Sequence, residues 1–200
     1  MSGNLKKQII EKAIELFNKK GYESVTMRDI SGALQISVGN LTYHFKKKDD
    51  ILYAIMIEQY NDHKNRNYST NISLQDFNSL LVEIMDHQLK YSFYFNNVVE
   101  MGKKYQEISK LQIKGKIYFN TLVKGIIQNF VDNGWMKKEQ YEGMYDNLSF
   151  AIFSIIMFWP QQNSLKDDEL SHNKNLLSII WSVLIPNLTD KGINDLHYNL

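Results

Sequence analysis

Apolar residues recur with helical spacing along most of the chain, and the first segments with this pattern are short. Over residues 5–20 they fall on one helix face, and Gly21 then suits a left-handed helix end. A second helix is predicted from Thr26 to about Leu34. Thr26 is the N-cap, and Asp29 three residues later completes a capping box, in which the two residues satisfy free backbone amides at the start of the helix.

The next two segments follow at close spacing. Ser37 suits the N-cap of a third helix over 38–45, and Asp49 and Asp50 suit the positive end of a fourth helix that begins near residue 49. Three short helices, with a turn of three or four residues between the second and third, have the geometry of a helix-turn-helix.

The rest of the chain continues as helix. After a polar loop over 65–73, the pattern predicts helices over 73–95, 98–105, 107–132, 138–159 and 172–185, which makes about nine in all. The last two are apolar around most of their circumference, so each must be buried on all sides. In a chain of 200 residues, pairing them with the same two helices of a second copy satisfies this requirement.

The pattern therefore predicts an all-α fold with two domains. An amino-terminal helix-turn-helix domain occupies 1–48, and a larger helical domain, which includes the two predicted dimer helices, occupies 49–200, with its first helix as the connector. The two prolines, Pro160 and Pro186, both lie late, so little interrupts long helices before them.

Composition narrows the class of protein. The chain is 44% hydrophobic and 22% charged, as in ordinary globular proteins, and it has no cysteine that would require an oxidising compartment. No signal peptide is visible, and the longest apolar run, residues 150–159, is half of the roughly 20 residues that a membrane span needs. We expect a cytoplasmic protein with no membrane partner.

Charge is distributed unevenly along the chain. The whole chain carries only +1, but residues 1–48 hold nine Lys or Arg residues against four acidic ones. A basic amino-terminal module on a mildly acidic remainder suits contact with phosphates through one end of the molecule.

Residues 21–52 read GYESVTMRDISGALQISVGNLTYHFKKKDDIL, and this segment resembles the amino-terminal domain of TetR-family regulators. The matching positions lie at fixed spacing over about 45 residues. They are Phe17, Gly21, Thr26, Ile30, Ile36, Ser37, Gly39, Leu41, His44, Phe45, Lys48 and Leu52. The resemblance implies a transcription regulator, and more specifically a repressor, that binds a pseudo-palindromic DNA operator as a homodimer.

The outer face of the third helix carries small or polar side chains that fit a major groove about 12 Å wide. Asn40 and Thr42 can reach base edges, Arg28 can pair with guanine, and the resemblance gives Lys48 a phosphate contact. The alternative is an ordinary solvated helix face, and His44 suits packing equally well. The predicted DNA-binding residues are Thr26, Arg28, Ser37, Val38, Gly39, Asn40, Thr42, Tyr43, His44 and Lys48.

Three positions depart from the family pattern. Thr42 stands where an aromatic residue is usual, so a tyrosine contact cannot be transferred to it. Gln35 stands where the turn usually has glycine, which implies either a left-handed residue or a shifted turn. Gly32 weakens the second helix by roughly 1 kcal/mol relative to alanine.

Aromatic and methionine side chains are frequent beyond residue 90, and together with the resemblance they predict a site for a small apolar or aromatic effector that releases DNA. Such residues form core more often than pocket. Phe93, Tyr94 and Phe95 are consecutive, so at least one should meet solvent, a neighbouring helix or a cavity. The predicted ligand-binding residues are His87, Tyr94, Glu100, Met101, Tyr105, Phe119, Phe153 and Met157.

Other functions have less support in the sequence. The five histidines lack metal-ligand spacing, and there is no Gly-rich phosphate loop, so we expect neither an enzyme nor a metal or cofactor. A DNA-binding regulator controlled by a protein partner, or working without a ligand, stays open because an aromatic core and an aromatic pocket look alike in sequence.

Overall fold

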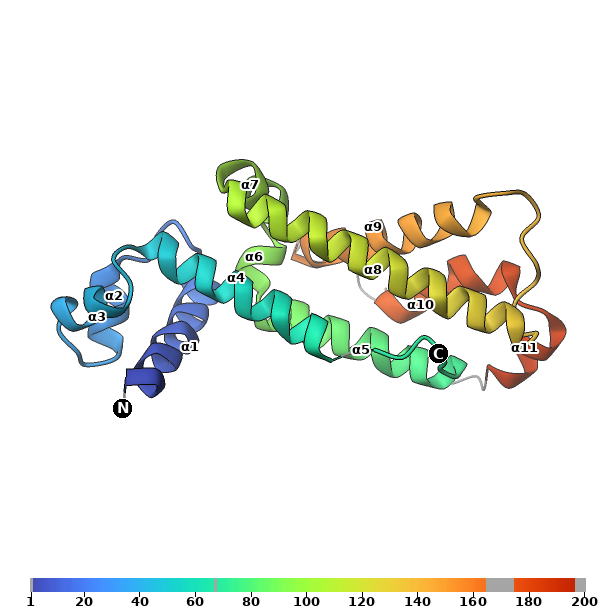
Figure 1. Ribbon diagram of the computed structural model, residues 1–200, viewed down its shortest axis with the longest axis horizontal. Helices are drawn as coiled ribbons and strands as arrows, with labels where there is room; N and C mark the ends of the chain where they lie inside the picture. The colour runs from blue at the N-terminus through green and yellow to red at the C-terminus, as the bar shows by residue number, and fades with distance from the viewer. Residues whose placement is uncertain (1, 67, 165–174, 197–200) are drawn as a thin grey trace. The chain divides into compact units, whose positions relative to one another are not determined.

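The computed structural model describes residues 2–66, 68–164 and 175–196, and within these ranges the chain is helical without any strand (Figure 1). This confirms the all-α prediction. The helices are α1 (Ser2–Lys20), α2 (Met27–Ala33), α3 (Val38–His44), α4 (Lys48–Asn65), α5 (Leu74–Lys90), α6 (Ser92–Phe95), α7 (Val98–Lys104), α8 (Gln106–Asp132), α9 (Met144–Ser164), α10 (Leu176–Leu184) and α11 (Asp190–Asp195), with a 3-10 turn, η1, at Ile185–Asn187. None of these helices is long and apolar enough to cross a bilayer.

The predicted helix over 73–95 is wrong at its end, because the chain breaks at Tyr91 into α5 and α6. The break is stabilised by Asn18 of α1. Its side-chain amide donates to the carbonyl of Lys90 (2.9 Å), and its Oδ1 accepts from the amide of Phe93 (3.0 Å). A contact between residues so far apart in the chain leaves no mark on the local pattern.

The predicted helix over 138–159 is wrong at its start, since α9 begins at Met144. Gly143 adopts a left-handed φ of 83°, which ends any helix running in from 138. Glu139 instead accepts a hydrogen bond from the amide of Tyr145 (2.8 Å), at the beginning of α9. For the predicted helix over 172–185, residues 172–174 lie outside the described residues, and α10 covers the following part.

The chain divides into two compact units: residues 1–66 with 90–113, and residues 67–89 with 114–200. This division differs from a boundary at residue 48, because α4 packs against α1 and belongs to the first unit. Its residues Ile51, Leu52 and Ile55 are fully buried. The connector helix is thus built into the unit that contains the helix-turn-helix.

Phe17 lies at the centre of the first unit and is fully buried. Its ring makes edge contacts with Tyr22 (5.0 Å between ring centroids) and with Phe93 of α6 (5.3 Å). Phe93, Tyr94 and Phe95 are all buried, because α6 is a single turn with other helices around it. Phe93 meets a neighbouring helix, which is one of the three environments expected for this aromatic run.

The core of the second unit is mostly aliphatic and includes three large aromatic side chains. Trp181 of α10 is fully buried against Phe77 of α5 (5.7 Å), and Phe77 contacts Phe130 of α8 (5.8 Å). Helices α8 and α9 lie side by side in opposite directions (Figure 1), since Phe119 meets Phe153 while Lys124 pairs with Asp146. This unit is therefore held by partners that are distant in sequence.

Candidate nucleic-acid interface

Helix α2 begins with the predicted capping box. The Asp29 amide donates to the Thr26 hydroxyl (3.2 Å), and the Thr26 amide donates to Asp29 Oδ2 (2.8 Å). These hydrogen bonds from Thr26 hold the pKa of the Asp29 carboxyl below its usual range. The Thr26 hydroxyl therefore orders the first turn of α2, and Arg28 within that turn is exposed.

The turn between α2 and α3 contains Gln35 in a left-handed conformation, with φ of 56°. The amide of Gln35 donates to the carbonyl of Gly32 (3.1 Å), and the amide of Ile36 donates to that of Ser31 (3.0 Å). This pair of hydrogen bonds is the Schellman closure of a helix, which ordinarily uses glycine at the left-handed position. Of the two possibilities left open by the sequence, the left-handed residue is the one observed.

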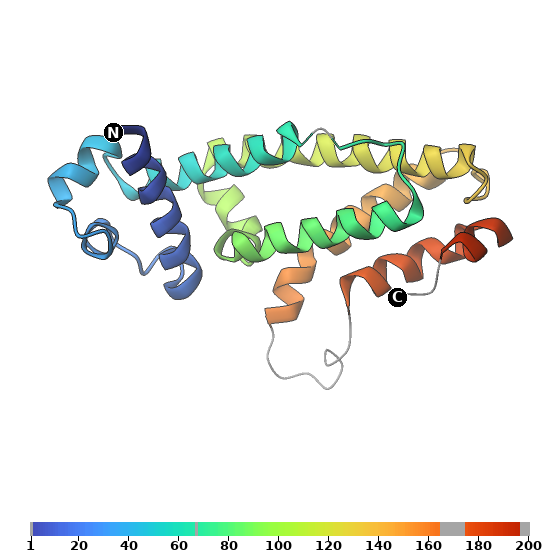
Figure 2. The same cartoon turned by 90° about the horizontal axis from the view of Figure 1, so that it is seen from below.

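Helix α3 has a buried and an exposed side. Ser37 caps it by accepting from the amide of Asn40 (3.0 Å), while Leu41 is buried completely and fixes α3 to the unit. On the other side Val38 is 40% exposed and Tyr43 is 82% exposed. Figure 2 shows α2 and α3 side by side next to α1. The predicted helix-turn-helix is therefore formed, with the outer side of α3 accessible.

The other predicted residues of α3 differ in their exposure to solvent. Gly39 and Asn40 are exposed, whereas Thr42 and His44 are half-buried. The Thr42 hydroxyl donates to the carbonyl of Gly39 (3.1 Å), and the His44 ring makes an edge contact with Tyr43 (5.3 Å). Asn40 and Tyr43 consequently present the most accessible polar groups on this helix.

Lys48, at the first position of α4, points toward the turn after α1. Its ammonium donates to the carbonyls of Tyr22 (2.7 Å) and Glu23 (3.2 Å) and lies 4.3 Å from the centre of the Tyr22 ring. The ammonium thus joins α4 to the turn at residues 21–25. A phosphate contact by the same group stays a prediction.

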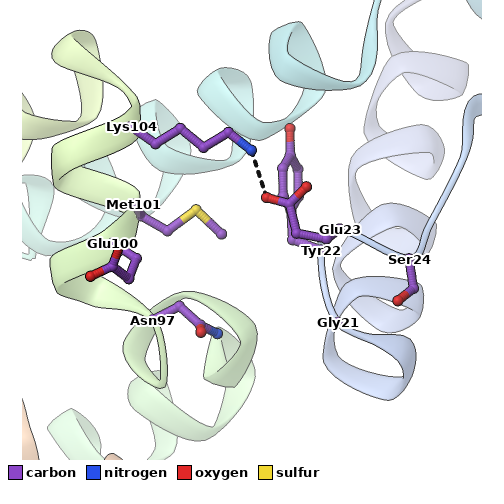
Figure 3. A pocket seen from close by; sticks show the side chains of 8 residues that line it. All are labelled: Gly21, Tyr22, Glu23, Ser24, Asn97, Glu100, Met101 and Lys104. Carbon is purple, nitrogen blue, oxygen red and sulfur yellow. Dashed lines mark hydrogen bonds and ion pairs between the residues drawn. The ribbon is translucent and has the colours of Figure 1, made fainter.

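A hollow of about 330 Å³ lies within the first unit, between the turn at residues 21–25 and α7 (Figure 3). It is lined by Gly21, Tyr22, Glu23, Ser24, Asn97, Glu100, Met101 and Lys104. Lys104 forms an ion pair with Glu23 (2.7 Å) across it. The hollow contains two of the predicted ligand-binding residues, Glu100 and Met101.

The remaining predicted ligand-binding residues are divided between the units. In the first unit Tyr94 is buried, which raises its pKa to about 12, and the Tyr105 hydroxyl lies 3.4 Å from that of Tyr22. In the second unit the rings of Phe119 and Phe153 are 5.4 Å apart.

Two more predicted ligand-binding residues belong to the second unit. His87 of α5 is buried, and Met157 of α9 is half-buried. The eight predicted ligand-binding residues are thus divided between the two units, four in each. Their role in ligand binding stays a prediction.

Sequence reasoning missed two residues that organise the first unit, Tyr22 and Asp49. The Tyr22 hydroxyl donates to Asp49 Oδ1 (2.6 Å), 27 positions away in the chain. The local pattern around Asp49 indicates only a favourable interaction with the helix dipole. The single available signal was an aromatic residue directly after the helix-ending Gly21.

Two family models together match nearly the whole chain. Residues 9–55 match the model for bacterial regulatory proteins of the tetR family, and residues 56–196 match the TetR model of a bacterial transcriptional repressor. The second match alone spans more than half of the chain.

Individual proteins agree with these matches. The probable HTH-type transcriptional regulator YttP of Bacillus subtilis is 24% identical over 161 residues, which cover 78% of this chain and 77% of YttP. IcaR of Staphylococcus aureus, the negative transcriptional regulator of the biofilm operon icaADBC, is 28% identical over 153 residues, or 70% of this chain and 77% of IcaR.

Among solved structures, a TetR-family transcriptional regulator from Marinobacter aquaeolei superposes with a TM-score of 0.83 at 25% identity. The superposition covers 96% of this chain and 95% of that one. The chain belongs to the TetR family of bacterial regulatory proteins, which are DNA-binding transcription regulators and not enzymes.

Proposed function

We propose that the chain is a repressor that binds a pseudo-palindromic operator as a homodimer and leaves it when a small apolar or aromatic effector binds. The observation that carries the DNA-binding part is the exposed side of α3. It presents Val38, Asn40 and Tyr43 without any charge, while Leu41 anchors the opposite side in the core. Side chains of this size can enter a major groove and reach base edges.

Exposed apolar side chains on α9 support the homodimer. Phe150 is 53% exposed and Phe158 is 45% exposed, although both lie on a helix whose Ile152 and Ile156 are buried. Exposed aromatic residues at this spacing favour association with another apolar surface. A second copy of α9 and α10, placed about a twofold axis, covers them. The proposed operator then requires the two α3 helices of the dimer to lie about 34 Å apart, as successive major grooves do.

The effector part rests on family membership and on the aromatic side chains of the second unit. Phe119 of α8 and Phe153 of α9 are both half-buried and pack against each other, with 5.4 Å between their ring centroids, so a planar or apolar effector would bind beside this aromatic pair or separate it. Control by a protein partner, or regulation without a ligand, is the alternative. A titration of candidate compounds into the preformed protein–DNA complex separates them, because an effector must lower operator affinity as it binds.

Selection of bound fragments from a random DNA pool tests the DNA-binding part. We expect a pseudo-palindrome with two half-sites centred one helical turn, or a small multiple of it, apart. Asn40→Ala should relax the preference at one base of each half-site by about 1–3 kcal/mol. Lys138→Ala, a change at an exposed lysine of the second unit, serves as the control. Recovery of unrelated sequences by the unaltered protein would contradict operator recognition.

A further inference from the structure

Tyr22 has a set of contacts that exceeds what packing alone requires. Its side chain is only 4% exposed, and its ring packs against Phe17. Its hydroxyl donates to Asp49 Oδ1 (2.6 Å) and accepts from the Tyr105 hydroxyl (3.4 Å). A buried hydroxyl with both a donor and an acceptor contact is held in one orientation.

Both of the first two residues of α4 depend on Tyr22. Asp49 receives the hydroxyl, while the Lys48 ammonium lies over the ring (4.3 Å) and on the backbone carbonyl (2.7 Å). Two opposite charges on adjacent residues thus both contact Tyr22, although Lys48 also donates to the Glu23 carbonyl (3.2 Å) and Asp49 lies 3.9 Å from the Lys47 ammonium. The first turn of α4 cannot move away without losing all three contacts.

The start of α4 in turn limits the position of α3. Helix α3 ends at His44 and α4 begins at Lys48, so three residues join them. Three residues span at most about 10 Å, and Phe45 among them is buried. A shift of the first turn of α4 is therefore passed to the exposed side of α3 and not absorbed by a loop.

On its other side Tyr22 meets the end of α7. Tyr105 follows the last residue of α7, and its ring makes an edge contact with Tyr22 (6.1 Å between ring centroids). The neighbouring ion pair between Lys104 and Glu23 is largely exposed, so its own contribution is small. The hydroxyl pair is the better protected of the two links.

We propose that Tyr22 is a positioning residue for operator binding, which sets the first turn of α4 and through it α3, and that Tyr105 orients the Tyr22 hydroxyl. The proposal rests on the proposed DNA-binding function. Burial raises the pKa of Tyr22 well above its usual range, so the hydroxyl keeps its proton and donates to Asp49 at any pH at which the protein is studied.

The variant Tyr22→Phe tests the proposal, because it keeps the ring and removes only the hydroxyl. We expect operator affinity to fall about fivefold while the slope of affinity against salt stays the same, since no phosphate contact is lost. Hydrogen exchange should speed up at the backbone amides of residues 51–54, which donate to the carbonyls of the first turn of α4. Tyr53→Phe, a change at a 37% exposed tyrosine of the same helix α4, is the control and should alter none of these.

Tyr105→Phe, alone and combined with Tyr22→Phe, tests whether Tyr105 acts through the Tyr22 hydroxyl. If Tyr105 acts through the Tyr22 hydroxyl, the double variant binds the operator as well as Tyr22→Phe alone. Additive losses would overturn that part of the proposal. Unchanged affinity of folded Tyr22→Phe, or a loss with a shallower salt slope, would overturn the whole.

Two further measurements keep the outcome clear. If circular dichroism shows that Tyr22→Phe is unfolded, Asp49→Ala replaces it, because alanine leaves the Tyr22 hydroxyl without this acceptor. The same loss of affinity is expected, and its absence would equally overturn the proposal. If the unaltered protein selects no operator, the proposed DNA-binding function fails. If it selects one and Tyr22→Phe binds it equally well, only the positioning role fails.

Discussion

The reading head, which we define as residues 26–45, and the second unit, residues 67–89 with 114–200, are stabilised in different ways. In the reading head each helix end is made by contacts over three to five positions, such as Thr26 with Asp29 and Ile36 with Ser31. In the second unit Trp181 donates to Asn78 (2.5 Å) across 103 positions. Local signals specify the reading head, whereas packing between distant segments specifies the second unit.

The largest expected effect comes from Trp181→Ala, which tests whether distant packing holds the second unit. Removing this fully buried ring should lower the free energy of unfolding by about 3–5 kcal/mol, because the cavity next to Phe77 cannot close completely. Urea denaturation measures the loss. Val82→Ala, a change at a 45% exposed residue of α5, should cost less than about 0.5 kcal/mol. Equal effects of the two variants would contradict the packing described for Trp181.

The second largest effect is expected from Lys48→Met, a change at the first residue of α4, just after the reading head. If the ammonium leaves the Tyr22 and Glu23 carbonyls to meet a phosphate in the complex, operator affinity falls about tenfold and the salt slope shrinks by about one. Lys46→Met, a change at an exposed neighbour, is the control for general charge. A loss of affinity with an unchanged slope would mean that Lys48 only holds α4 against the turn at residues 21–25 and contacts no phosphate.

Gln35→Gly tests the cost of a non-glycine residue at the left-handed position of the turn between α2 and α3. At φ of 56° glycine avoids the steric cost of a side chain, so the variant should gain about 0.5–1 kcal/mol in free energy of unfolding. Gly21→Ala is the reverse experiment, since Gly21 has φ of 78° and no atom lies within 4 Å of the place that a Cβ would take. It should lose about 1 kcal/mol through backbone strain alone. Thermal melts that moved the two variants in the same direction would refute this interpretation.

The smallest expected effect is the pH dependence of the capping box. Because hydrogen bonds from Thr26 lower the pKa of Asp29 in the folded chain, its carboxylate stabilises α2 above the ordinary pKa of 3.8, and that contribution is lost as the pH falls further. The melting temperature of Asp29→Asn should therefore lie below that of the unaltered protein at about pH 6 and approach it at about pH 3. A constant difference over this range would rule out the carboxylate as the cause.

The features that sequence predicted well are those with a short physical range. The capping box at Thr26, the cap at Ser37 and the left-handed helix end at Gly21 each need only residues within one turn. The all-α class followed from helical spacing over the whole chain. The outer side of α3 followed as well, because Leu41 and Phe45 had to face inward.

The predicted helix bounds are wrong where a distant side chain, or the backbone conformation of one residue, determines where a helix begins or ends. The break at Tyr91 depends on Asn18, and the late start of α9 depends on Gly143 and Glu139. Residue type predicted eight ligand-binding residues, but type alone cannot distinguish an aromatic side chain in a core from one beside a cavity, and these residues are distributed over both units.

The sequence by itself determined the all-α class, the caps of α2 and α3 and the helix-turn-helix, since these depend on hydrogen bonds and spacing within a few residues. Only the tertiary structure decided that Tyr22 would join Asp49, Lys48 and Tyr105. Those partners come from segments 26 to 83 positions away. Their meeting depends on how the helices pack, because no local pattern encodes which buried hydroxyl faces which carboxylate.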